Sequence, residues 1–304
     1  MSADQLVEDN EEFDLEKLLQ DDDDPMLSKV VTTVYGAKGS GKTTFVLQSA
    51  LYLPRDHVIL AISFDGQTMP IKQALSRQHG NQVGNRIIVK SGVADYPRVT
   101  PKDWQVKSFE SVKKVLGLLK KVSQLPEKKR PYIVLLDGME ILSKMCEQVM
   151  RYKYGLDAFS GFGERTRWHY RTFLMDAVHD HALQATRRHL VYTTYPTIVD
   201  KTTKNGEVID REESPRWLGN MEKKTDTVIR TDRVTIAPTI NVSQSRQAQS
   251  NQDVAMISRA VFYATIDSSK RFPEYTGKRF NVTGKSFLHL FDKQWTKESE
   301  LVEE

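Results

Sequence analysis

The segment Gly36–Thr43 most constrains what this chain can fold into, because its sequence, GAKGSGKT, matches the spacing G-x-x-x-x-G-K-[ST] without a gap. A β-branched run, Lys29–Tyr35, precedes it, and a helix-like segment, Lys42–Leu53, follows it and is ended by Pro54. In a strand–loop–helix unit, such glycines let successive backbone N–H groups curl around a phosphate. The sequence therefore predicts a nucleoside triphosphate site at this loop.

Different residues of the loop are expected to bind the phosphates and the metal. Lys42 is expected to reach the β and γ phosphates, and the Thr43 hydroxyl is expected to ligate Mg²⁺. The helix that begins near Lys42 directs the positive end of its dipole at the same anion. We expect ATP with Mg²⁺, bound by Gly36, Ala37, Lys38, Gly39, Ser40, Gly41, Lys42, Thr43 and Thr44.

A second motif is the apolar run Tyr132–Leu136, which is too short for a helix and is followed directly by Asp137. Parallel α/β sheets place their ligands at the carboxyl ends of the strands. Asp137 is therefore predicted to hold the Mg²⁺ together with Thr43, directly or through water.

Hydrolysis requires a side chain that orients water in line with the γ-phosphate. In many ring-forming motor ATPases a Glu directly follows the strand-end Asp, but here that position is Gly138. Asp65, which ends the apolar run Val58–Phe64, is the favoured candidate. Glu140 is the alternative, and it would serve only if the loop after Asp137 curled back.

Strand-like and helix-like segments alternate through most of the chain, which indicates βαβ units and a mostly parallel sheet. The predicted helices include Phe109–Leu125 and Thr166–Ala185, and the further predicted strands include Arg86–Val89 and His189–Thr194. After Thr225, strand-like runs follow one another without long helices, which favours antiparallel strands at the edge of the sheet; they are Asp226–Ile236, Arg259–Ile266 and Arg279–Val282. We predict an acidic tail (1–25), one ATPase domain (26–292) and a short acidic C-terminal tail (293–304).

The net charge of +4 conceals an asymmetry, because residues 1–25 hold eleven acids and one base and the rest of the chain is therefore +14. A basic body favours a polyanionic partner such as nucleic acid, although the acidic segment is also compatible with a simple solubilising tail. Cys146 is the single cysteine, which excludes an intramolecular disulfide. No apolar run approaches the roughly 20 residues that span a bilayer, so we expect a cytoplasmic protein.

Taken together, these features resemble RecA-type P-loop ATPases, and more closely the compact RecA-like ATPases of phages and archaeal viruses that act in recombination and single-strand annealing. The resemblance covers roughly Leu27 to Phe291 and rests on the order of the motifs along the chain. It implies a central, mostly parallel sheet flanked by helices, and a homo-oligomer in a ring or filament. The family carries its catalytic carboxylate on the strand after the phosphate-loop helix, where Asp65 lies here.

The resemblance also implies two further sets of site residues. A polar γ-phosphate sensor ends the strand after the Asp137 strand, which corresponds to Thr193 and Thr194, and Thr194 is our choice. Basic residues late in the chain reach the γ-phosphate of a neighbouring subunit, which corresponds to Lys270 and Arg271. A basic group supplied by a neighbour would make hydrolysis depend on assembly.

RecA-like proteins bind DNA with the loops that follow these two strands. The first matching region, 151–170, interleaves basic and aromatic residues, a combination suited to single strands because bases stack on rings while cations follow phosphates. The second region, Lys201–Lys224, is mixed in charge, and in both regions the aromatic residues could instead form a packed core. The predicted DNA contacts are Arg151, Lys153, Arg165, Arg167, Trp168, Lys201 and Lys204.

The leading interpretation is an ATPase that binds single-stranded DNA, self-assembles and acts in recombination, annealing or replication, in a virus and hence in host cytoplasm. The alternatives are a DNA-translocating motor, such as a packaging ATPase or a helicase, and a nucleotide-gated scaffold that does not hydrolyse ATP. A small-molecule kinase is less favoured, because no arginine-rich lid is recognisable. The acidic N-terminal tail would compete with DNA, or insert Phe13 and its apolar neighbours into an adjacent subunit or another protein partner.

Overall fold

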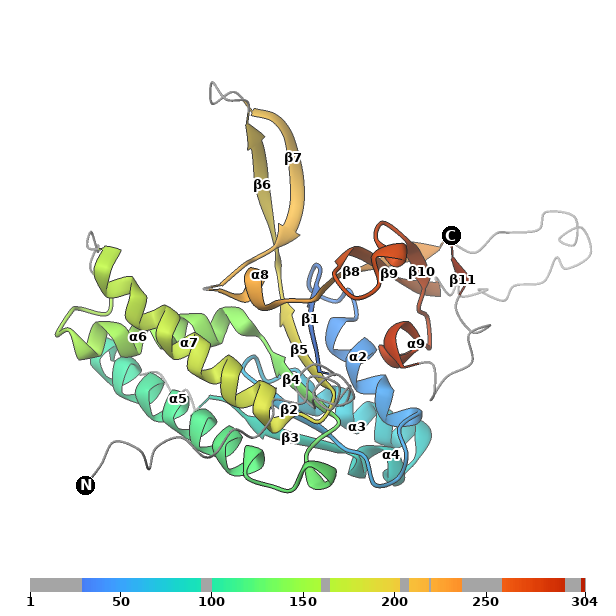
Figure 1. The fold of residues 1–304 in the computed structure, drawn as a ribbon, viewed down its shortest axis with the longest axis horizontal. Helices are drawn as coiled ribbons and strands as arrows, with labels where there is room; N and C mark the ends of the chain where they lie inside the picture. Colours follow the sequence, from blue (N-terminus) through green and yellow to red (C-terminus); the bar gives the residue numbers. More distant parts are fainter. Residues whose placement is uncertain are drawn as a thin grey trace, which may run out of the picture.

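The structure is a computed structural model that describes residues 29–93, 100–159, 165–202, 208–218, 220–236, 259–292 and 302–303. Its centre is a nine-stranded sheet (Figure 1). In spatial order the strands are β11 (Val302–Glu303), β10 (Arg279–Asn281), β9 (Arg259–Ser269), β8 (Thr227–Ile236), β1 (Val30–Tyr35), β5 (His189–Thr194), β4 (Ile133–Asp137), β2 (Ile59–Ser63) and β3 (Ile87–Ser91).

The sheet divides into a parallel part and an antiparallel edge. Strands β8, β1, β5, β4, β2 and β3 run parallel to one another, whereas β9, β10 and β11 are added antiparallel. This arrangement confirms the predicted fold class, including the antiparallel strands at the C-terminal edge. Part of the predicted C-terminal tail, Val302–Glu303, pairs with β10 and so belongs to the sheet.

Strands β1, β2, β4 and β5 are buried along their whole length. They lie in the middle of the sheet with helices on both faces, which explains why they appear in the sequence as continuous apolar or β-branched runs without alternation. The register of the pairing places Asp137 beside Thr193 of β5 and beside Ser63 of β2. The carboxyl ends of these strands therefore meet at one edge of the sheet.

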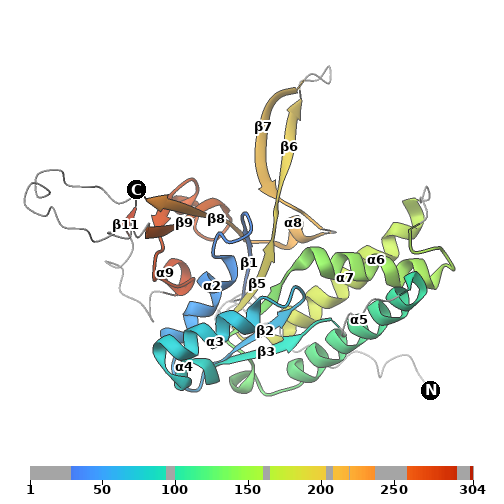
Figure 2. The same cartoon turned by 180° about the vertical axis from the view of Figure 1, so that it is seen from behind.

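Two groups of helices cover the two faces of the sheet (Figures 1 and 2). The first face carries α2 (Lys42–Leu47), α3 (Thr68–His79), α4 (Asn81–Asn85) and α9 (Leu288–Phe291). The second carries α5 (Pro101–Ser123), α6 (Met139–Lys153) and α7 (Arg165–Ala185). Among the described helices, none is long and apolar enough to cross a membrane.

Several helices differ from the sequence-based expectation. Helix α2 ends at Leu47 and continues as a 3₁₀ helix over Gln48–Leu51, so the predicted helix is shorter. Helix α5 begins eight residues before the predicted start, because Thr100 and Asp103 form a capping box and Pro101 takes the first helical position. Helices α3 and α6 were not predicted.

An antiparallel hairpin follows β5 and is formed by β6 (Pro196–Thr202) and β7 (Val208–Pro215). It overlaps the first part of Lys201–Lys224, the region of mixed charge predicted to be a DNA-binding loop. The hairpin stands away from the helices and the sheet (Figure 1). It is followed by the short helix α8 (Met221–Lys224), which leads into β8. Its root, Pro196 paired with Pro215, lies directly after the carboxyl end of β5.

Candidate nucleotide-binding site

The phosphate loop connects the carboxyl end of β1 to the first turn of α2, as the motif predicts. Two of its glycines have no room for a side chain. A Cβ atom at Gly36 would lie 2.3 Å from the carbonyl oxygen of Thr231, and one at Gly41 would lie 2.9 Å from the ring of Phe262. Both residues also have positive φ angles, 154° and 90°, which disfavour any residue with a side chain. The loop is therefore fixed between α2 and the β8–β9 edge.

Lys42 lies across this loop. Its Nζ atom donates to the carbonyl oxygens of Gly36 (2.8 Å) and Ala37 (3.0 Å), and it lies 4.6 Å from the centre of the Tyr195 ring. Burial lowers the pKa of Lys42, and three carboxylates oppose this shift, with that of Glu140 acting more strongly than those of Asp137 and Asp65. The ammonium group thus belongs to a compact cluster of charges.

Asp137 is buried at the end of β4 and is held by three hydroxyl groups. Its Oδ1 atom accepts from Thr43 (2.8 Å) and Thr193 (2.5 Å), and its Oδ2 atom accepts from Thr68 (2.6 Å). The predicted pair of metal ligands, Thr43 and Asp137, is therefore in direct contact. Oxygen ligands of this kind suit Mg²⁺, which is typically held by one or two carboxylates plus phosphates.

No group of three or more His, Cys, Asp or Glu side chains able to hold a metal occurs among the described residues. The Thr43 hydroxyl and the Asp137 carboxylate are both oxygen donors, so the residues present fit Mg²⁺ bound together with a nucleotide.

Asp65 follows β2 and lines a cavity at the phosphate loop, which Lys42 and Asp137 also line and which measures about 300 Å³. Its Oδ1 atom accepts from the backbone N–H of Gln67 (2.9 Å). Burial raises the pKa of the Asp65 carboxyl, and the nearby Asp137 adds to this rise, while the hydrogen bond from Gln67 opposes it. The side chain is only partly buried.

Glu140 enters the cavity because Gly138 adopts a left-handed conformation with φ of 93° and begins α6 at Met139. The loop after Asp137 thus curls back, which is the condition given above for Glu140 to orient water. Glu140 is 8% exposed, and its Oε1 atom accepts from the Thr194 hydroxyl (2.5 Å) and from the backbone N–H of Tyr195. Its Oε2 atom is buried and has no hydrogen-bond partner among the described residues.

Thr194 and Thr193 each hold one carboxylate of the site. Thr193 donates to Asp137, whereas Thr194, the predicted γ-phosphate sensor, donates to Glu140 and is 1% exposed. The Thr194 hydroxyl therefore has a carboxylate partner, and its role as a γ-phosphate sensor stays a prediction. Tyr195 and Phe262 line the site and Thr68 holds Asp137. None of the three was predicted, because each reaches the site through the packing of segments that are distant in the sequence.

Lys270 and Arg271 lie at the opposite end of the sheet from the phosphate loop. They follow Ser269, which pairs with Thr227 at the start of β8, whereas the loop follows Tyr35, which pairs with Arg230. Lys270 donates to the carbonyl oxygen of Lys223 and Arg271 to that of Lys29. Neither reaches the site of its own chain, and their action on a neighbouring subunit stays a prediction.

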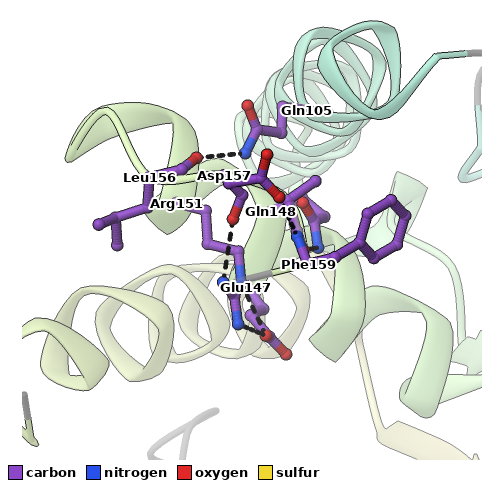
Figure 3. Close-up of polar contacts among 8 residues, drawn as sticks. Gln105, Glu147, Gln148, Arg151, Leu156, Asp157 and Phe159 are labelled. Carbon is purple, nitrogen blue, oxygen red and sulfur yellow. Dashed lines mark hydrogen bonds and ion pairs between the residues drawn. The ribbon is translucent and has the colours of Figure 1, made fainter. Parts of the chain in front are cut away.

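Arg151, predicted to contact DNA, instead holds the turn between α6 and α7 in place (Figure 3). It is 7% exposed, it pairs with Glu147 on the preceding helical turn at 2.9 Å, and it donates to the Asp157 carbonyl (3.1 Å). Gln105 of α5 donates to the carbonyl of the preceding residue, Leu156 (2.8 Å). Arg151 therefore faces the inside of the helical layer, and little of it is accessible to DNA.

The turn and the helices next to it present aromatic rings to solvent. We call this surface the helix tip; it comprises the exposed rings of Phe109, Tyr152, Tyr154, Phe159 and Phe173 together with Lys153, Arg167, Trp168, Tyr170 and Arg171. Phe159 is 69% exposed and its ring lies 5.7 Å from that of Trp104. Lys153 lies 3.6 Å from the centre of the Tyr170 ring, and Arg171 lies 4.7 Å from that of Trp168.

Three predicted DNA contacts lie partly or wholly outside the described residues. The backbone of Arg165 begins α7 and that of Lys201 lies in β6, but their side chains are outside the described part of the structure, as is the whole of Lys204. The hairpin strands carry four acidic and two basic residues. They also expose Ile198 and Val199, at 67% and 46%.

No protein-family model and no curated protein matches this chain. Among solved structures, it is similar to the RadB recombinase, with a TM-score of 0.45, 15% sequence identity, and coverage of 84% of this chain and 89% of that chain. It is also similar to an ATPase from the type III secretion system of pathogenic bacteria, with a TM-score of 0.37 and 13% identity, over 66% of this chain and 50% of the other. Function is therefore inferred from the site itself.

Proposed function

We propose that this chain is a RecA-like ATPase that acts on single-stranded DNA in recombination, annealing or replication. The observation that carries the proposal is the meeting of Lys42, Asp137 and Glu140 in one cavity at the phosphate loop. The loop supplies backbone N–H groups and an ammonium group for phosphates, while the two carboxylates serve a metal and a water. A glycine turn without this function would not require a half-buried ammonium group and two buried carboxylates around it.

The roles of the residues follow from their contacts. Lys42 would bind the β and γ phosphates, and Thr43 and Asp137 would hold Mg²⁺, which neutralises charge on the phosphates when it is bound. Asp137 is already oriented by the hydroxyls of Thr193 and Thr68, so little reorganisation is needed. Its buried position lets the metal act in surroundings of low dielectric constant.

We assign the orientation of water to Glu140 in preference to Asp65. One oxygen of Glu140 is fixed by Thr194 and Tyr195, and the other is buried and unpartnered in the part of the chain that the structure describes. A fixed carboxylate with one unused oxygen beside Lys42 is suited to accept a proton from water. Asp65 has the shorter side chain and is less buried than Glu140.

Single-stranded DNA would contact the helix tip. Exposed rings offer faces on which bases stack in any sequence, and Lys153 and Arg167 offer positive charge to the phosphates. Helix α6 connects the tip with the site, because Glu140 lies in its first turn and Lys153 at its last residue. The chain would self-assemble, with Lys270 and Arg271 directed at a neighbouring subunit.

The test is ATP turnover in the wild type and in Lys42→Ala, Glu140→Gln and Asp65→Asn. We expect Lys42→Ala and Glu140→Gln to lose turnover by at least about 100-fold and Asp65→Asn to retain most of it. The reverse order for the two carboxylates would move the water-orienting role to Asp65. No measurable turnover in the wild type would favour a nucleotide-gated scaffold, and directional strand displacement would favour a motor.

A further inference from the structure

A second cavity lies beside the phosphate loop, between α2 and the strands β9 and β10. It measures about 130 Å³, and its lining includes Thr44, Gln48, Phe262 and Thr283. It shares Gly41, Thr44 and Phe262 with the cavity that holds Lys42 and Asp137. The two cavities are therefore neighbouring parts of one continuous depression around the start of α2.

Phe262 forms the wall between the loop and this second cavity. Its ring lies against Gly41, where a Cβ atom would be 2.9 Å from Cδ1. Its backbone is bonded to the segment that follows β10, because its N–H donates to the Thr283 hydroxyl (2.9 Å) and its carbonyl accepts from the N–H of Val282 (2.9 Å). A flat ring is thus fixed in position next to the phosphate-binding backbone.

The opposite wall comes from the helix that follows the loop. Thr44 and Gln48 are four residues apart, so their side chains lie on one face of the chain as it leaves the loop. Gln48 carries an amide with both a donor and an acceptor. A ring on one side and an amide on the other suit a flat heteroaromatic group that has a polar edge.

We propose that Phe262 and Gln48 form the subsite for the base of the nucleotide, with the base stacked on the Phe262 ring and its edge bonded to the Gln48 amide. The inference rests on the proposed ATPase function, because the phosphates must occupy the loop for the base to reach this cavity. A glutamine amide can pair in a bidentate manner with the amino group and ring nitrogen of adenine, which guanine does not offer in the same pattern. The subsite therefore selects adenine over guanine.

The experiment compares the binding of ADP, GDP and inorganic pyrophosphate by calorimetry in the presence of Mg²⁺. These probes are not hydrolysed in the way ATP is, and pyrophosphate reports the loop alone. We expect wild-type protein to bind ADP more tightly than pyrophosphate and more tightly than GDP. Phe262→Ala should weaken ADP about tenfold and leave pyrophosphate unchanged, whereas Phe262→Trp should restore ADP binding.

Two variants of Gln48 complete the test without altering the wall that touches Gly41. Gln48→Ala should reduce the preference for ADP over GDP, and Gln48→Trp should block ADP while pyrophosphate still binds. Equal affinity of the wild type for ADP and pyrophosphate would overturn the subsite. So would a Gln48→Trp variant that binds ADP normally. Failure of the wild type to bind any of the three probes would instead contradict the proposed ATPase function.

Discussion

The helix tip and the β6–β7 hairpin both start from the nucleotide site, yet they present different surfaces. Helix α6 starts beside Asp137 and ends at the tip, and the hairpin starts directly after Thr194. Residues 151–171 hold five basic and two acidic side chains, whereas the hairpin strands hold four acidic and two basic ones. The sequence assigned DNA contacts to both regions, but charge and aromatic exposure favour only the tip.

The difference indicates that the two regions have different roles, although both are connected to Glu140. Its peptide lies in the first turn of α6, and its carboxylate is held by Thr194 and Tyr195 at the root of the hairpin. Arg216, at the returning end of the hairpin, donates its N–H to the Tyr195 carbonyl (3.0 Å). An acidic hairpin repels a phosphate backbone, so we expect it to influence the position of Glu140 without binding DNA.

The largest expected effect concerns the residue that both regions share. Glu140→Gln keeps the size of the side chain and removes its charge, so ATP turnover should fall by at least about 100-fold while nucleotide binding remains. Thr194→Val, which removes one hydrogen bond to Glu140, should cause a smaller loss. Steady-state turnover with separately measured ADP affinity checks both. Full turnover in Glu140→Gln would remove the link between tip and hairpin.

Arg151 allows the structural and DNA-binding roles to be separated within the tip. Arg151→Ala leaves Glu147 without its partner and frees the Asp157 carbonyl, so the free energy of unfolding should fall by about 2 kcal/mol. Denaturant unfolding measures this change. Exposed Arg211 in the hairpin, whose partner Asp200 is also exposed, is the matched control, and Arg211→Ala should change stability by under about 1 kcal/mol. Equal losses of unfolding free energy in the two variants would mean that the buried Arg151 contacts stabilise the protein no more than the exposed pair of Arg211 and Asp200.

The rings of the tip should contribute to DNA affinity more than the apolar residues of the hairpin. Phe159→Ala should weaken binding of an oligothymidine by roughly tenfold, because one stacking face is lost. Ile198→Ala removes a side chain of similar exposure from the hairpin and should change the affinity less than twofold. Fluorescence anisotropy at fixed salt measures both. A larger loss for Ile198→Ala would transfer the DNA site to the hairpin.

A smaller effect is expected in the salt dependence of DNA binding. Lys153→Ala should reduce the slope of log affinity against log salt by about one unit if this ammonium group neutralises one phosphate. Titrations at several salt concentrations give the slope. An unchanged slope would show that Lys153 serves only to pack against the ring of Tyr170.

The sequence predicted features that depend on neighbouring residues better than features that depend on contacts between distant segments. The strand–loop–helix unit around Gly36–Thr43 and the strand that ends at Asp137 were predicted correctly, because such elements are encoded in neighbouring residues. Glu140 was left as an alternative, since its entry into the cavity depends on the turn at Gly138 and on the placement of β5 beside β4. Phe262 was missed because it reaches the loop through the pairing of β9 with β8.

The two projecting regions show a second limit. Basic and aromatic residues near Arg151 predicted a contact surface, but the side of α6 on which each one lies could not be fixed before the packing against α5 was known. The hairpin was missed because its strands mix charges with apolar residues, without the strict alternation of a half-buried strand.

The most direct test of the account is ATP turnover measured with and without single-stranded DNA, in the wild type and in a variant with Phe159→Ala and Lys153→Ala combined. We predict that DNA raises turnover in the wild type, and that the combined variant keeps its basal turnover and loses the rise. Turnover that is the same with and without DNA in the wild type would contradict the coupling of the nucleotide site to DNA at the helix tip.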